Sequence, residues 1–195
     1  MAKLESSLKN MLLSLTLISL SASALLAGGY ALTKDPIDKA AQDKKDQAIK
    51  EVLPQGHISL DKPVEIKLEG FADAFIVYPA REGEKLVGCA IETYDNNGYG
   101  GKIKTMVGLD SQGNIINYSI LETNETPGLG AKASEWFKTK GDIRGKNPSQ
   151  ESFKVSKDGG EIDAITASTI TSRAFIASIK SAYKAFEKYQ EQSKQ

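Results

Sequence analysis

The most pronounced pattern in the chain is a run of 24 residues without a charged side chain, from Asn10 to Thr33. As an α-helix this run would extend about 36 Å, at about 1.5 Å per residue, which is enough to cross a bilayer. A cleaved secretory signal is the alternative, with a basic start at Lys3 and Lys9 and a small-residue cleavage site at Ala22-Ser23-Ala24. Because the apolar run continues to Leu32, we expect an uncleaved membrane anchor.

After this run the chain becomes polar and then alternates between apolar and polar positions. Residues 34–51 are rich in Asp, Lys, Gln and Ala and predict a polar helical stalk that ends before Pro54. Short β-rich runs follow, separated by Gly, Asn and Asp turn signals, which predicts an antiparallel meander. The predicted strands cover residues 74–78, 86–94, 103–109 and 115–121. Residues 153–155 and 162–165 predict a further hairpin, closed by Lys157-Asp158-Gly159-Gly160.

The last part of the chain has the periodicity of an amphipathic helix. Its apolar residues recur at helical spacing and form one face: Phe175, Ile176, Ile179, Ala182, Tyr183 and Phe186. That face must pack on the sheet. The sequence therefore predicts an α+β fold, in which an N-terminal transmembrane helix precedes a single domain with a mainly antiparallel sheet packed by helices. We expect the anchor with its N-terminal end in residues 1–33, the stalk in residues 34–53 and the domain in residues 54–195.

Composition removes several classes of function. Twenty-five Lys and Arg balance twenty-five Asp and Glu, so the chain lacks the positive field of a nucleic-acid binder, and nucleic acid is not an expected partner. The single Cys89 and the single His57 leave no internal disulfide and no Cys/His zinc site. His57 lies in a polar stretch, and we expect no catalytic acid or base and no metal site.

Residues 163–174, Asp-Ala-Ile-Thr-Ala-Ser-Thr-Ile-Thr-Ser-Arg-Ala, lead from a predicted strand through a hydroxyl-rich turn into the final helix. Two interpretations are open. The hydroxyl groups can cap the free N–H groups of the helix start. Alternatively, the helix start can bind an anion such as a phosphate, which small residues allow to approach the backbone. The segment lacks the Gly-Lys-Thr pattern of a phosphate-binding loop, so a nucleotide hydrolase is not implied.

Residues 122–132, Glu-Thr-Asn-Glu-Thr-Pro-Gly-Leu-Gly-Ala-Lys, follow a predicted strand and precede a predicted helix through Trp136 and Phe137. Their Pro and Gly residues fit a tight strand-to-helix connection, and they equally fit a backbone-lined edge against which a planar ligand lies. Residues 97–102, Asn-Gly-Tyr-Gly-Gly-Lys, also leave backbone exposed before a strand.

The chain resembles the FMN-binding G subunit of the Rnf electron transport complex. The resemblance rests on the order of its features: the anchor, the stalk, and then the motifs at residues 98–101, 125–130 and 163–174. The similarity covers nearly the whole chain. In that family a threonine that ends a Ser/Thr-Gly-Ala-Thr-x-Thr motif carries FMN through a phosphoester bond, which a flavin transferase adds. The matching stretch here is residues 166–171, so the resemblance implies covalent FMN on Thr171. Ala167 and Ser168 replace the usual Gly and Ala; both are small, although Ala167 resists a positive φ angle.

The resemblance also implies a site and a cellular setting. The expected FMN contacts besides Thr171 are Thr166, Ser168, Thr169, Ser172, Thr126, Pro127, Gly128, Leu129 and Gly130. The chain would be an electron-transfer component of an ion-translocating ferredoxin:NAD oxidoreductase, working beside other membrane subunits. It would cross the inner membrane once, with a cytoplasmic N-terminal end and the FMN-binding domain in the periplasm.

Three alternatives remain open on the sequence. The first is a component like the related C subunit of the sodium-translocating NADH:quinone reductase. The second is an anchored binding module without flavin. The third is an acyltransferase, because Ser181-Ala-Tyr-Lys184 has the spacing of a serine–lysine motif, although Tyr183 belongs to the packed helix face.

Overall fold

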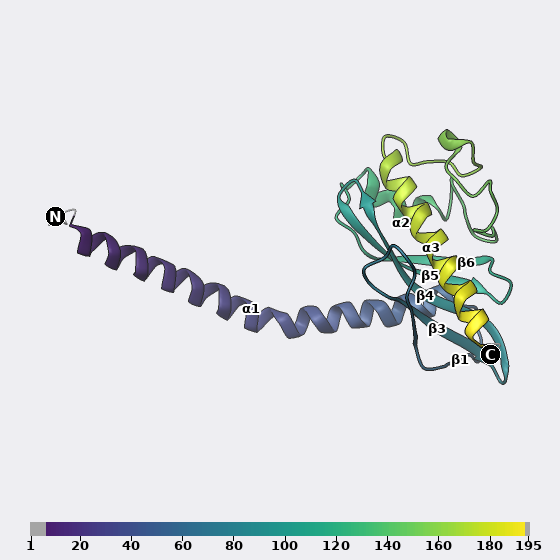
Figure 1. Cartoon of the computed structure of the whole chain (residues 1–195), viewed down its shortest axis with the longest axis horizontal. Helices are drawn as coiled ribbons and strands as arrows, with labels where there is room; N and C mark the ends of the chain where they lie inside the picture. Colours follow the sequence, from purple (N-terminus) through teal and green to yellow (C-terminus); the bar gives the residue numbers. More distant parts are fainter. Residues whose placement is uncertain (1–6, 194–195) are drawn as a thin grey trace. The chain divides into compact units, whose positions relative to one another are not determined.

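The structure is a computed structural model that describes residues 7–193. Lys3, part of the predicted basic start, lies outside the described residues. By their contacts, the residues form two units, Met1–Asp43 and Lys44–Gln195. Helix α1 (Leu8–Val52) supplies the described part of the first unit and enters the second (Figure 1). It is continuous from the apolar run through the polar stretch and contains Pro36.

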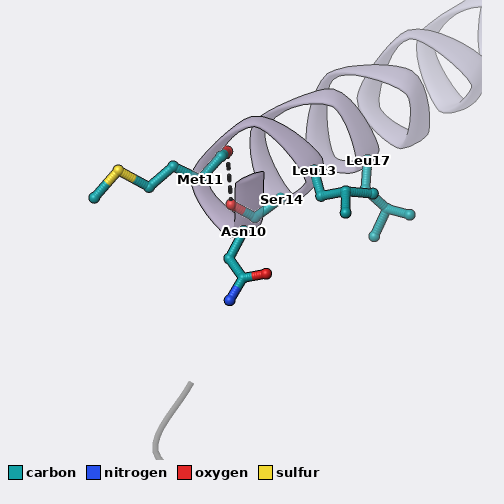
Figure 2. Close-up of a pocket in the computed structure, with 5 residues that line it drawn as sticks. All are labelled: Asn10, Met11, Leu13, Ser14 and Leu17. Carbon is teal, nitrogen blue, oxygen red and sulfur yellow. Dashed lines mark hydrogen bonds between the residues drawn. The ribbon is translucent and has the colours of Figure 1, made fainter. Parts of the chain in front are cut away.

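The first part of α1 has the properties of a membrane span. Its most apolar window has a mean hydropathy of 1.9 and no buried residue, so length and composition fit a single-pass anchor. Five residues near its start line a pocket on the helix surface and are drawn in Figure 2: Asn10, Met11, Leu13, Ser14 and Leu17. Ser14 Oγ donates a hydrogen bond to the Met11 carbonyl at 3.0 Å, which satisfies the hydroxyl within the helix. All five lining residues belong to α1, so the pocket is a feature of the surface of a single helix.

The second unit is built on an antiparallel sheet. Its strands are β1 (Ser59–Leu60), β2 (Val64–Ile66), β3 (Phe75–Glu82), β4 (Lys85–Gly98), β5 (Gly101–Asp110) and β6 (Ile115–Glu122). The order across the sheet is β1-β3-β4-β5-β6, and β2 also pairs with β3. The predicted α+β fold with a mainly antiparallel sheet is confirmed.

Helix α3 (Thr169–Ser193) lies across one face of this sheet (Figure 1) and packs against β3, β4 and β5. Phe175, Ile179 and Phe186 lie in the main core together with Val77 and Ile91 of the strands. The apolar face predicted from helical spacing is thus the face that packs. The short helix α2 (Ala133–Trp136) follows the 3₁₀ turn η1 (Gly130–Lys132).

The opposite face of the sheet is covered by the end of α1. Ile49 and Val52 pack with Ala90 and Met106 in a second, smaller cluster. The adjacent strand residues Ala90 and Ile91 therefore point to opposite faces of the sheet, Ala90 toward this cluster and Ile91 toward the main core, because side chains alternate along a strand. Gly108 has no side chain because a Cβ there would collide with the Val52 carbonyl.

A buried carboxylate also joins the end of α1 to the sheet. Glu92 forms ion pairs with Lys45 at 2.7 Å and Lys104 at 2.5 Å, and its side chain is 8% exposed. Burial raises the pKa of Glu92, but the hydrogen bonds from Lys104 and Lys45 outweigh this and lower it below its usual value. The carboxylate is therefore charged and paired at neutral pH.

The hairpin predicted between residues 153–155 and 162–165 is wrong. Val155 and Ile162 form one isolated parallel bridge, and the 3₁₀ turn η2 (Ser156–Asp158) stands between them. Both side chains are buried in the main core, so side-chain burial and local turn bonds hold the segment in place of a strand ladder. Strands β1 and β2 were not predicted because two or three residues carry no periodicity.

Candidate functional site

Thr171 lies in the first turn of α3 and is 1% exposed. Its Oγ1 donates a hydrogen bond to Glu125 Oε2 at 2.7 Å. The hydroxyl is therefore committed to a carboxylate and does not cap a backbone N–H group. The buried Oγ of Ser172 ties down the turn before α3, because it accepts a hydrogen bond from the Ile165 N–H and donates one to the Ser168 carbonyl, both at 2.9 Å.

Ala167, just before α3, has a φ angle of +61°. Among the described residues it is the only one other than glycine with positive φ. A Cβ in this region approaches the following carbonyl and is strained. This is the position at which the sequence resemblance calls for glycine, and the backbone here keeps the glycine-like angle despite the alanine.

Glu125 is a buried carboxylate, 7% exposed, that three glycines surround. Its Oε1 accepts a hydrogen bond from the Gly100 N–H at 3.0 Å. A Cβ on Gly98 would lie 2.7 Å from Oε1, and a Cβ on Gly130 would collide with Oε2 and lie 2.8 Å from Thr171 Oγ1. The glycines of two sequence motifs therefore give this carboxylate access to Thr171.

These groups border a cavity of about 610 Å³. Its lining comes from three segments far apart in the sequence: Tyr99, Glu125, Thr126, Leu129, Gly130, Ala167, Ser168, Thr169, Ile170 and Thr171. Tyr99, Leu129 and Ile170 are 73%, 43% and 51% exposed, respectively. The cavity thus combines a polar floor at the helix start with apolar side chains that face solvent.

Positive charge lies close to the same helix start. Lys157 Nζ donates a hydrogen bond to Thr169 Oγ1 at 3.0 Å. Together with the positive end of the α3 dipole, this ammonium group favours an anion in the cavity. Arg173 is engaged elsewhere, in a two-pronged ion pair with Asp158.

The structure brings most of the expected contact residues together, with some exceptions. Thr126, Leu129, Gly130, Ser168, Thr169 and Thr171 line the cavity. Pro127, Gly128, Thr166 and Ser172 are outside its lining; Ser172 is fully buried as a structural hydroxyl, and the other three are exposed. The sequence reasoning named Ala167 only as a departure from the family motif, and it did not name Glu125, Tyr99 or Ile170 as contacts. All four lie inside stretches that it had marked, but a local pattern does not indicate that a carboxylate is buried.

Other reactive side chains lie outside this cavity. Ser181 Oγ donates to the Ala177 carbonyl of its own helix, while Lys184 is exposed, and within residues 7–193 no hydrogen bond joins the two. Cys89 is fully buried, and burial raises its pKa to about 12, so its thiol stays protonated. His57 is exposed.

Comparison with known proteins gives consistent matches. Residues 98–184 match the FMN-binding domain family. The chain is similar to the G subunit of the ion-translocating oxidoreductase complex of Vibrio cholerae serotype O1 (strain M66-2), with 33% identity over 182 residues, 87% of this chain and 86% of the relative. The corresponding protein of Aliivibrio fischeri (strain ATCC 700601 / ES114) is 33% identical over 195 residues, covering 95% of this chain and 93% of the relative. The family match spans all three segments that line the cavity.

Proposed function

The chain belongs to the family of G subunits of ion-translocating oxidoreductase complexes, and from this premise we propose that it is an electron-transfer component carrying FMN on Thr171 in a phosphoester bond. The complex would be a membrane-bound ferredoxin:NAD oxidoreductase, with other membrane subunits as partners and a flavin transferase for maturation. The observation that carries the proposal is the place of Thr171 in the cavity wall, in the first turn of α3.

The residues around the cavity fit FMN. The volume of about 610 Å³ lies within the range of small-molecule sites, roughly 300–1,000 Å³. The helix start and Lys157 suit the phosphate. The exposed Tyr99, Leu129 and Ile170 offer apolar surface to a flat aromatic ring.

When bound, FMN supplies one- and two-electron redox chemistry. The residues of the chain hold and orient it: the first turn of α3 holds the phosphate, and the turn at residues 126–130 contacts the ring. Attachment through the phosphate leaves the ring unmodified. It also prevents loss of the cofactor, which matters for a domain that faces a large external volume.

We place the domain on the periplasmic side of the inner membrane. In this topology residues 1–33 comprise a cytoplasmic end and the anchor, residues 34–53 the stalk and residues 54–195 the FMN-binding domain. The apolar part of α1 supports retention of the anchor, because its helix continues past Ala24 without interruption. The family resemblance supports the side, since a large domain can be translocated regardless of its flanking lysines.

The attachment is tested by coexpressing the full chain with a flavin transferase and mapping the flavin by denaturing-gel fluorescence and peptide mass spectrometry. The wild type and Thr171→Ser should carry an FMN-sized addition on residue 171. Thr171→Val should carry none, because it keeps the shape of the side chain and loses the ester oxygen. Loss of the hydroxyl's bond to Glu125 should cost about 1.5–3 kcal/mol, so this variant still folds.

Thr169→Val is the matched control, since Thr169 lies in the same helical turn and lines the same cavity. It should keep its flavin. An addition on Thr166 or Thr169 would make the site assignment wrong. A wild type that stays free of covalent flavin beside an active transferase would leave the anchored binding module as the better description.

A further inference from the structure

Glu125 is a buried carboxylate in the lining of the cavity, where a negative charge would repel an anionic ligand. Its carboxylate is 7% exposed, and among residues 7–193 no Lys or Arg forms an ion pair with it, whereas the buried Glu92 has two lysines. A buried charge without a cation is unfavourable. It also lies beside the helix start that would receive a phosphate.

The geometry gives this carboxylate a target. Oε2 of Glu125 lies 2.7 Å from Oγ1 of Thr171, and the hydroxyl donates its proton along this line. A general base must lie within hydrogen-bond reach of the proton that it removes. A threonine hydroxyl is a weak nucleophile until an adjacent base activates it. The Gly100 N–H, bound to the other carboxylate oxygen at 3.0 Å, keeps Oε2 directed at Thr171.

We propose that Glu125 is the catalytic base for flavin attachment, so that the acceptor chain itself supplies a catalytic residue for its own modification. This inference rests on the proposed function, because it requires Thr171 to be the acceptor. The Oγ1–H proton passes to Glu125 Oε2 while Oγ1 forms a bond to the flavin-side phosphorus of a flavin dinucleotide. The P–O bond to the nucleoside monophosphate breaks, and that group leaves with the bridging oxygen and the electron pair. No oxidant or reductant takes part.

The transferred proton also resolves the conflict between Glu125 and the phosphate. Before the step, Glu125 is negative and accepts the Thr171 proton. After the step, the diester beside it is negative, and Glu125 is a neutral acid that can donate a hydrogen bond. The proton transfer therefore prevents a negative Glu125 from facing the negative diester once the bond has formed, at a buried position where their repulsion would be weakly screened.

The motif at residues 125–130 also helps to bring the Glu125 carboxylate against the Thr171 hydroxyl. Gly130 leaves room for Oε2 and Oγ1 to meet, since a Cβ there would collide with Oε2 and lie 2.8 Å from Oγ1. The Thr126 carbonyl accepts hydrogen bonds from the N–H groups of Leu129 and Ala131, with N–O distances of 3.1 and 3.2 Å. These bonds close the chain between Glu125 and Gly130 into a compact turn that returns to Thr171. The spacing of Glu and Gly in this motif thus places the base against the acceptor.

The test compares Glu125→Gln with wild type in purified full-length chain, using purified flavin transferase and FAD. The amide keeps the size, and its one acceptor oxygen can accept the Thr171 hydroxyl while its NH2 group faces the Gly100 N–H. It does not take up the proton, and it is easier to bury than a carboxylate. The attachment rate at saturating chain should fall at least about a hundredfold. The chain concentration giving half the maximal rate should stay within about twofold, because docking is unchanged.

Glu122→Gln is the matched control, since Glu122 is exposed at the end of β6, three residues away. It should react like wild type. Glu125→Asp keeps the carboxylate but withdraws it by one methylene, so its attachment rate should fall roughly tenfold. This variant replaces Glu125→Gln in the comparison if circular dichroism shows that Glu125→Gln does not fold. A wild-type rate in Glu125→Gln, or in a folded Glu125→Asp when Glu125→Gln does not fold, would overturn the role of Glu125 while leaving Thr171 as acceptor. An unmodified wild type would instead remove the proposed function and this role together.

Discussion

Replacing Ala167 by glycine should stabilise the folded domain, contrary to the usual effect of an Ala-to-Gly change. Ala167 has a φ angle of +61° immediately before α3. A left-handed backbone costs an L-residue with a Cβ about 1–2 kcal/mol, and glycine does not bear this cost. Glycine has more conformational freedom in the unfolded chain, and this reduces the gain in folding stability by about 0.4–1 kcal/mol. The net expectation is a gain of roughly 0.5–1 kcal/mol in the free energy of unfolding.

Space does not limit this change, because Ala167 is exposed and the substitution only removes a methyl group. Urea unfolding of the full chain in detergent is a suitable assay. Trp136 is the only tryptophan, and its Nε1 donates to the Asp163 carbonyl at 2.7 Å, close to the segment under study. Its fluorescence therefore reports loss of structure near the site. The urea midpoint should rise at an unchanged slope.

The matched control is Ala177→Gly, a half-buried position inside α3. There glycine should lower stability by about 1 kcal/mol, because the angles are helical and only the entropic effect remains. The two substitutions should thus shift the midpoint in opposite directions. A loss of stability in Ala167→Gly as large as that in Ala177→Gly would refute the left-handed conformation of residue 167 and the strain argument with it.

Two further predictions concern the docking of α1 and the topology. Glu92→Gln should lower the free energy of unfolding by about 1.5–3 kcal/mol at neutral pH, since it removes the charge that binds Lys45 and Lys104. The pKa of Glu92 is lowered in the folded state. Its carboxylate therefore stabilises the fold above the unfolded pKa of about 4.3, and this stabilisation is lost as the pH falls through the folded pKa. The urea midpoints of wild type and Glu92→Gln should therefore converge in acid. Protease added to intact spheroplasts should digest residues 54–195 without cell lysis, and full protection before lysis would contradict the periplasmic placement.

Much of the fold follows from local pattern. The long strands were predicted within a few residues because β-branched alternation and glycine turns agree there. The apolar face of α3 was predicted because its helix is long and its spacing regular. The hairpin after Phe153 failed for the opposite reason: short apolar runs beside glycines look like strands, while Val155 and Ile162 are held by burial in a core that the local sequence does not reveal.

The site was predictable in part. Strands β4 and β5 meet at Gly98 and Gly101, and β6 ends with Glu122 paired to Lys104 near the start of β5. Antiparallel order therefore brings the two glycine-rich motifs to the same end of the sheet. The burial of Glu125 against Thr171 could not be predicted, because it depends on how the start of α3 meets that end. Likewise, Ala167 signalled a positive φ angle only through the family resemblance.

The anchor limits what this chain can do within the complex. Between Asn10 and Thr33 it offers the bilayer no ionisable side chain except the weakly acidic Tyr30, and ion passage through a membrane needs polar groups shielded by several packed helices. On the proposed function, the energy-conserving step is therefore expected where electrons leaving the domain act on helices of other subunits. FMN attached at the start of α3, as proposed, would suit this arrangement, because that helix is packed along the sheet. The end of α1 is docked on the opposite face through Val52 and Glu92. On the proposed function, the chain carries electrons and the movement of ions belongs to other subunits.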